Sequence, residues 1–230
     1  GRTGALFVKI YGAEREKRVE ILLDLSLSMT VSEDKELFAC RLAAALAHVA
    51  LAAGDSVAVA AAGPGAEGGA AGRRSRKGLR ASRAIVAWLE RLPASGVVDW
   101  PELATRLRAG PRIPGAMVVI SDFWTEGAVE AILPLVKGRQ EVTLLRVLTP
   151  EELSPPYDGN VRLEDAETGE EVSLRLSFGD LDAYRAEVEN RIQSLAARAS
   201  RHGMRHLLCC TDTPFEAAVL TYLRRGGLLR

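Results

Sequence analysis

Short apolar segments that alternate with helix-length segments constrain the fold of this chain most strongly. Apolar residues run almost continuously through residues 19–24, as in a central strand that is covered on both faces. Further strands of this kind are predicted at 56–62, 116–122, 141–148 and 206–210. Because helical segments separate them, the sequence predicts a Rossmann-like α/β fold, an open and mostly parallel sheet with helices on both faces.

The predicted helices follow from apolar residues at helical spacing. In the segment 33–53, Phe38, Leu42 and Leu46 fall on one face, and Gly54 ends the helix. The other helices are predicted over residues 82–92, with Ser82 as N-cap, and over 101–109, 126–137, 181–202 and 215–225.

We expect a single domain over residues 1–230. The segment 149–178 is interpreted as a connector and an added β-hairpin, because 161–165 and 170–176 alternate around a turn. The chain begins without Met, which predicts that it is a fragment of a longer protein, and the sequence leaves open whether a membrane anchor precedes it.

Charge and cysteine content narrow the function. Thirty Lys and Arg balance thirty Asp and Glu, which argues against a chain-wide design for binding nucleic acid or membrane. The basic cluster at 73–83 lacks aromatic residues for base stacking, so it is interpreted as a solvated loop or a contact for an acidic protein. Three cysteines exclude a disulfide-stapled scaffold and favour the cytoplasm. No apolar stretch approaches the roughly 18 residues of a membrane helix.

Acidic residues end two of the predicted strands. Asp24 is followed by Ser26 and Ser28 at alternating positions, and Asp122 ends the strand 116–122. Because parallel strands gather ligands at their carboxyl ends, both acids are expected to face one crevice. Carboxylate and hydroxyl oxygens suit a hard cation, so these four residues are predicted to bind Mg²⁺, or alternatively Mn²⁺ or Ca²⁺. The other interpretation is that the serines serve the loop and Asp24 forms an Asx turn.

The motif Asp24-x-Ser26-x-Ser28 resembles the metal-ion-dependent adhesion site of von Willebrand factor A domains. Other segments are similar to an uncharacterised bacterial family that is often encoded beside MoxR-type AAA+ ATPases. The similar segments are residues 1–8, Asp24–Met29, Ser121–Phe123, Pro150–Glu152 and Asp165–Glu170. The resemblance covers nearly the whole chain and implies a sheet of strand order 3-2-1-4-5-6.

The resemblance also implies a function. Members are expected to be non-enzymatic protein-interaction domains, in which the metal takes an acidic side chain from the partner. The implied partner is a MoxR-type ATPase, in a chaperone-like or assembly role. At one position the chain departs from the family, because Val98 replaces the expected Thr ligand and has no oxygen. Water or Asp99 could complete the site; otherwise the chain is a metal-independent interaction module with a defunct site.

Enzymatic alternatives fit the sequence less well. A phosphatase of the haloacid dehalogenase type needs a second Asp where Ser26 stands, and Ser cannot act as a general acid at neutral pH. A serine hydrolase needs a G-x-S-x-G elbow, which the sequence does not contain. A metal-dependent phosphoesterase lacks a positioned base beyond the ligands. The sequence therefore predicts a protein that is not an enzyme.

Overall fold

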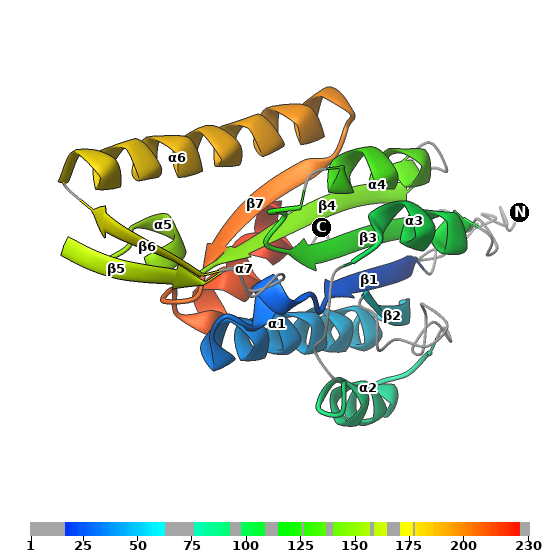
Figure 1. Cartoon of the computed structure of the whole chain (residues 1–230). Helices are drawn as coiled ribbons and strands as arrows, with labels where there is room; N and C mark the ends of the chain where they lie inside the picture. Colours follow the sequence, from blue (N-terminus) through cyan, green and yellow to red (C-terminus); the bar gives the residue numbers. More distant parts are fainter. Residues whose placement is uncertain are drawn as a thin grey trace, which may run out of the picture.

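The structure is a computed structural model of the 230-residue chain (Figure 1). It describes residues 17–62, 76–92, 98–108, 115–125, 127–136, 140–156, 159–164, 171–176 and 178–225. The predicted motifs at residues 1–8 and 165–170, and residues 73–75 of the basic cluster at 73–83, lie outside the described residues.

A five-stranded parallel sheet forms the centre of the molecule (Figure 1). Its strand order is β2-β1-β3-β4-β7, so the predicted α/β class is confirmed. Each strand begins and ends within one residue of its predicted limits. The strands are β1 (Arg18–Asp24), β2 (Ser56–Ala62), β3 (Gly115–Ser121), β4 (Gln140–Leu148) and β7 (Arg205–Cys210).

The edge of the sheet beside β2 differs from the expected six-strand order. Within the described part of the chain this sheet has five strands, and they follow the expected order without its outermost member. At that edge Val57 forms one antiparallel bridge with Arg76, with backbone N···O distances of 2.9 and 2.8 Å. The segment between β2 and Arg76 lies outside the described residues.

Helices cover both faces of this sheet. Figure 1 shows α1 and α7 on one face and α3, α4 and α6 on the other. The helices are α1 (Glu33–Ala52), α2 (Ala81–Leu89), α3 (Trp100–Arg108), α4 (Ala128–Val136), α5 (Pro150–Leu153), α6 (Phe178–Arg201) and α7 (Phe215–Arg225), with a 3-10 helix at Leu27–Thr30. The predicted N-cap of α2 is wrong. Arg80 is the N-cap, and Ser82 is buried with its hydroxyl 3.2 Å from Nδ1 of His48.

Two hydrophobic layers explain why the strands are apolar almost throughout. Ile21 of β1 packs in the layer that contains Leu46 of α1 and Tyr222 of α7. Leu22, the next residue, packs in the opposite layer with Ile132 of α4. Neighbouring residues of one strand are thus buried on opposite faces, as in parallel sheets covered on both sides.

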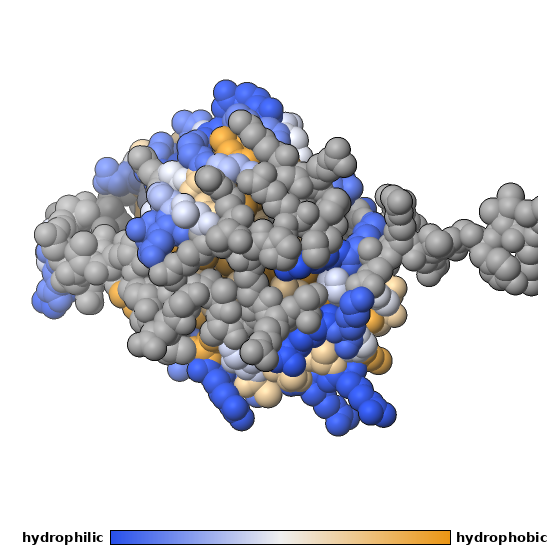
Figure 2. All heavy atoms as spheres, turned by 90° about the vertical axis from the view of Figure 1, so that its right-hand side faces the viewer, coloured by the Kyte–Doolittle hydropathy of each residue, from blue (hydrophilic) through white to orange (hydrophobic). Residues whose placement is uncertain are grey.

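The predicted hairpin is confirmed as a separate antiparallel pair of strands. It consists of β5 (Gly159–Glu164) and β6 (Glu171–Leu176) and follows the connector that contains α5. Figure 1 shows the hairpin beyond the carboxyl ends of the sheet strands. At the end where the strands begin, Figure 2 shows hydrophilic side chains projecting in many places, with hydrophobic ones in smaller separate spots. Within the described part of the chain, no helix is long and apolar enough to cross a membrane.

Two leucines of α1 test the hydrophobic layer between this helix and the sheet. Leu46 is fully buried, whereas Leu37 is 45% exposed on the same helix. Leu46→Ala should lower the free energy of unfolding by about 2–5 kcal/mol, because it leaves a cavity between helix and sheet. Leu37→Ala should change it by less than about 0.5 kcal/mol. Urea unfolding of both variants measures the difference, and equal losses would contradict this description of the core.

Candidate functional site

The predicted site residues lie at the carboxyl edge of the sheet. Asp24 ends β1, and Asp122 directly follows the neighbouring strand β3. Asp24, Ser26 and Asp122 are all buried, and Ser28 is partly buried. Ser121 links the two strand ends, because its hydroxyl donates to Oδ2 of Asp24 at 2.5 Å. The structure therefore brings Asp24, Ser26, Ser28 and Asp122 together as predicted.

Hydrogen bonds within the fold use both carboxylate oxygens of Asp24. Oδ2 accepts from Ser121, and Oδ1 accepts from the backbone N–H of Ser26 at 2.8 Å. The second bond is an Asx turn, the local role that the sequence left open. Burial raises the pKa of Asp24 to about 6, against the opposing effect of these hydrogen bonds, and the neighbouring Asp122 adds to the rise.

The two predicted hydroxyl ligands contact each other. The Oγ atoms of Ser26 and Ser28 are 3.0 Å apart. Ser26 also precedes the 3-10 helix that begins at Leu27. That short helix places both hydroxyls side by side at the entrance to α1.

The cation at this site is the ammonium group of Lys35. Its side chain has no exposed surface, and Nζ lies 2.8 Å from each of three acceptors: Oδ2 of Asp122, Oε1 of Glu152 and the carbonyl oxygen of Ser28. An ammonium group has three N–H donors, so this geometry satisfies all of them. The helix end is fixed as well, because the Ser32 hydroxyl accepts from the Lys35 backbone N–H.

Sequence reasoning missed Lys35, although the sequence contains a signal for it. Lys35 lies three residues before Phe38 and seven before Leu42, on the apolar stripe of α1. A lysine on the core face of a helix needs a buried acceptor, because an unpaired buried charge is strongly unfavourable. The spacing does not identify which acceptors it meets.

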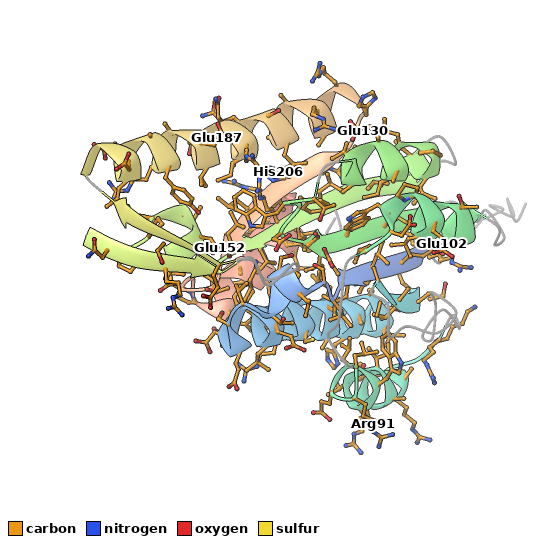
Figure 3. The ribbon with its side chains drawn as sticks, in the orientation of Figure 1. Arg91, Glu102, Glu130, Glu152, Glu187 and His206 are labelled. Carbon is orange, nitrogen blue, oxygen red and sulfur yellow. The ribbon has the colours of Figure 1, made fainter. Side chains whose placement is uncertain are left out.

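Glu152 holds the other side of the ammonium group. Its Oε1 also accepts from the indole N–H of Trp124 at 2.9 Å. Its Oε2 accepts from the backbone N–H of Thr149 at 2.8 Å, which completes the capping box of α5. Figure 3 shows Glu152 at the end of the sheet, close to the hairpin. The sequence marked Glu152 only as part of a similar segment and did not indicate this role.

Val98 and Asp99 have structural roles at the start of α3. Val98 is buried in the same hydrophobic layer as Trp100 and Phe123. Asp99 accepts the backbone N–H of Glu102 at 2.8 Å and thereby caps the helix. In this arrangement Asp99 serves α3, and Val98 contributes apolar surface where the resemblance expects a Thr ligand.

The contacts made by the four predicted metal ligands show whether a divalent ion would fit at this site. Asp122 is bonded to the Lys35 ammonium, Asp24 to two hydrogen-bond donors, and Ser26 to Ser28. A divalent ion at this point would be repelled by the buried ammonium a few ångströms away. Among the described residues, no group of three or more His, Cys, Asp or Glu is placed to hold a metal. The four predicted ligands do not fit a metal ion while the Lys35 ammonium stays in place, and the Mg²⁺ site stays a prediction.

Comparison with known proteins identifies a family. A family model described as a protein of unknown function, DUF58, matches residues 1–199. The uncharacterised protein Rv1480 of Mycobacterium tuberculosis is 28% identical over 231 residues, covering 94% of this chain and 70% of its own length. The uncharacterised protein MAV169 of Mycobacterium avium is 32% identical over 167 residues, covering 67% of this chain and 95% of its own. An uncharacterised family was predicted and is confirmed, whereas an association with MoxR-type ATPases stays a prediction.

Two solved structures share the fold. An aerotolerance-related membrane protein from Bacteroides fragilis, with multiple mutations to serines, superposes with a TM-score of 0.52 and 18% identity, covering 93% of this chain and all of that chain. The pilus adhesin SpaC from Lactobacillus rhamnosus GG superposes with a TM-score of 0.54 and 11% identity, covering 92% of this chain and 30% of that chain. At such identities the likeness concerns the fold alone.

Removal of the Lys35 ammonium should strongly destabilise the fold. Lys35→Met leaves the carboxylates of Asp122 and Glu152 buried without their cation, so we expect a loss of about 3–5 kcal/mol in the free energy of unfolding. Adding Asp122→Asn and Glu152→Gln should restore part of it. Lys77→Met, at an exposed lysine, should cost less than about 0.5 kcal/mol. Urea unfolding of the three variants measures these losses. A Lys35→Met variant as stable as the wild type would refute the proposed network.

The raised pKa of Asp24 predicts a pH dependence. The fold favours the protonated carboxyl, so this contribution to stability is complete below the unfolded pKa of 3.8 and is lost as the pH rises through about 6. Relative to Asp24→Asn, wild-type stability should fall by on the order of 3 kcal/mol between about pH 4 and pH 7. Urea unfolding of both proteins across this pH range measures the difference, and the contributions of the other titrating groups, which both proteins share, cancel in it. Parallel stability curves would exclude the shift.

Proposed function

This chain belongs to the DUF58 family, and we propose that it is a non-enzymatic protein-interaction domain whose contact face is the carboxyl end of the sheet. In this proposal Lys35 supplies the positive charge at the centre of that face, and no metal is required. The observation that supports it is the buried ammonium, which holds one acceptor from each of three separate segments.

A wide groove beside Glu152 supports an interaction role. It encloses about 1290 Å³ between the start of α1, α5 and the loop after β7. Val31 and Leu37 line it with large exposed apolar side chains, and Phe38 and Phe215 add aromatic surface. Exposed apolar side chains gathered in one groove are typical of a protein contact surface.

The groove also provides a route for an acidic side chain from a partner. Lys35 already has three acceptors, so an incoming carboxylate must replace one of them. Glu152 is the most accessible of its two carboxylate partners, with 17% of its side chain exposed against 2% for Asp122. We propose that a partner carboxylate reaches Lys35 by displacing Glu152 from the rim of the groove.

A non-enzymatic role agrees with how the polar groups are used. Asp24, Ser26 and Ser28 bond to one another or to Ser121, and these bonds build the loop. Nucleophilic catalysis needs a hydroxyl held by a base that is free to take its proton. Ser26 and Ser28 bond to each other. Ser121 donates to the Asp24 carboxylate, but its residue surface is only 1% exposed and its hydroxyl also accepts the backbone N–H of Phe123, so it is not presented to a substrate.

A metal-bridged form of the same domain is the second candidate. The hydroxyls of Ser26 and Ser28 lie side by side, as two ligands of one ion would. Mg²⁺ could bind there only if the Lys35 ammonium withdrew from Asp122. In that form the metal, rather than Lys35, would take the acidic side chain of the partner.

The class of partner rests on the resemblance. We propose a MoxR-type AAA+ ATPase, bound in a chaperone-like or assembly role in the cytoplasm. The three cysteines are free, which suits a reducing compartment.

Binding to a purified MoxR-type ATPase from the same organism tests this function, with calorimetry as the measurement. Leu37→Asp in the groove should weaken binding at least about ten-fold, because it puts a charge on apolar contact surface. Leu220→Asp is the matched control, since Leu220 on α7 is 47% exposed against 45% for Leu37 and does not line the groove. Affinity unchanged by EDTA is expected. Loss of binding in EDTA would favour the metal-bridged form, and equal effects of the two leucine variants would refute the groove.

A further inference from the structure

A second polar pocket lies between α4, α6 and the loop after β3. It encloses about 240 Å³ and shares no lining residue with the groove beside Glu152. Three arginines line it: Arg146 from β4, and Arg191 and Arg198 from α6. Trp124 forms another wall, with the guanidinium carbon atoms of Arg146 and Arg191 4.5 and 5.9 Å from its ring centre. Two cationic groups are thus held against one indole.

Arg146 is the unusual member of this set. Its residue surface is 1% exposed, and in the described part of the chain its Nε and Nη2 atoms have no hydrogen-bond partner. Buried guanidinium groups are normally paired, because an unsatisfied buried charge is costly. Burial lowers the pKa of Arg146, Asp122 and Glu152 oppose that shift, and Arg191 adds to it.

The rest of the pocket is also suited to a negative charge. Gly127, Ala128 and Val129 line it at the N-terminus of α4, a nine-residue helix whose first N–H groups lack acceptors within the helix. Glu187 is the acidic residue that lines the pocket, and it bonds to Nε of Arg191 at 2.8 Å. Figure 3 shows Glu187 on α6 and Glu130 on α4, and Glu130 pairs with Arg198.

The histidine on the strand beside Arg146 adds no charge to this balance at neutral pH. His206 lies on β7, one strand from Arg146 (Figure 3). Burial and the charge of Arg146 lower its pKa to about 4, so the imidazole is neutral at pH 7. Arg191 and Arg198 each pair with one carboxylate, and the hydrogen-bond donors left over at the pocket are those of Arg146 and of the α4 N-terminus.

We propose that this pocket binds a phosphate group, either free or esterified to a small molecule. Arg146 and Arg191 supply guanidinium donors, and α4 supplies backbone N–H groups. A tetrahedral phosphate offers several acceptor oxygens at once, which matches donors that converge from a strand and two helices. This inference does not rest on the proposed function, because the pocket and the groove have no lining residue in common.

Titration calorimetry of the whole chain with inorganic phosphate tests the pocket, at constant ionic strength set by chloride. Saturable binding is expected. Arg191→Gln should weaken it about ten-fold or more, since it removes hydrogen bonds to a charged group. Arg225→Gln on α7 is the matched control and should leave the affinity unchanged within about two-fold. Binding no stronger than that of chloride, or equal affinity in wild type and Arg191→Gln, would overturn the proposal.

A variant that should raise the phosphate affinity makes the test sharper. Glu187→Gln removes the competing carboxylate and frees Arg191, so phosphate affinity should rise; a fall would overturn the proposal. Arg146→Met should abolish binding, and circular dichroism establishes that this variant is folded.

Glycerol phosphate is the second probe. Tighter binding than that of inorganic phosphate assigns the pocket to phosphate esters, and weaker binding assigns it to the free ion. Acetate that binds as tightly as phosphate would refute the phosphate assignment.

Discussion

The ammonium group of Lys35 is the contact on which the carboxyl end of the sheet depends. It joins the loop after β1, the end of β3 and the helix α5, and its most distant partner, Glu152, lies 117 residues from Lys35 in the chain. A buried ion pair is favourable only when its geometry is good and its other donors and acceptors are satisfied. Here all three ammonium donors are bonded, and Glu152 is fixed in turn by Trp124 and Thr149. The network therefore determines where the loop, the strand and α5 meet.

Local patterns in the sequence predicted the fold well, because burial determines them residue by residue. Strands buried on both faces must be apolar throughout, so their limits in the sequence lie within one residue of those in the structure. Acidic residues at strand ends likewise predicted where the site lies. Helix ends were less accurate, because α2 begins with Arg80 as N-cap and uses Ser82 to bond His48. A hydroxyl near a helix start serves either role, and tertiary contacts decide which.

The chemistry of the site was harder to predict, because it depends on pairs that are distant in sequence. Ser26, Ser28 and the two aspartates form a pattern typical of a metal site, and a metal-free loop uses the same residues for an Asx turn and for hydrogen bonds between side chains. The difference lies in Lys35 and Glu152, whose contact no local spacing encodes. Arg146 was hidden in the same way, as a charge among the apolar residues at the carboxyl end of β4.

Lys35 also explains why Nε and Nη2 of Arg146 have no hydrogen-bond partner in the described part of the chain. Asp122 and Glu152 lie near both cations, so two carboxylates balance two buried positive charges. The carboxylates give their short contacts to Lys35 and to neighbouring N–H groups, and their charges also act on Arg146. Phe123, with a left-handed φ of 53°, turns the chain between Asp122 and Trp124, and the Trp124 indole bonds Glu152 while its ring packs on Arg146. The charge of Arg146 is therefore balanced within the fold, whereas two of its hydrogen-bond donors, Nε and Nη2, stay unused. Arg146 lines the pocket that is proposed to bind phosphate.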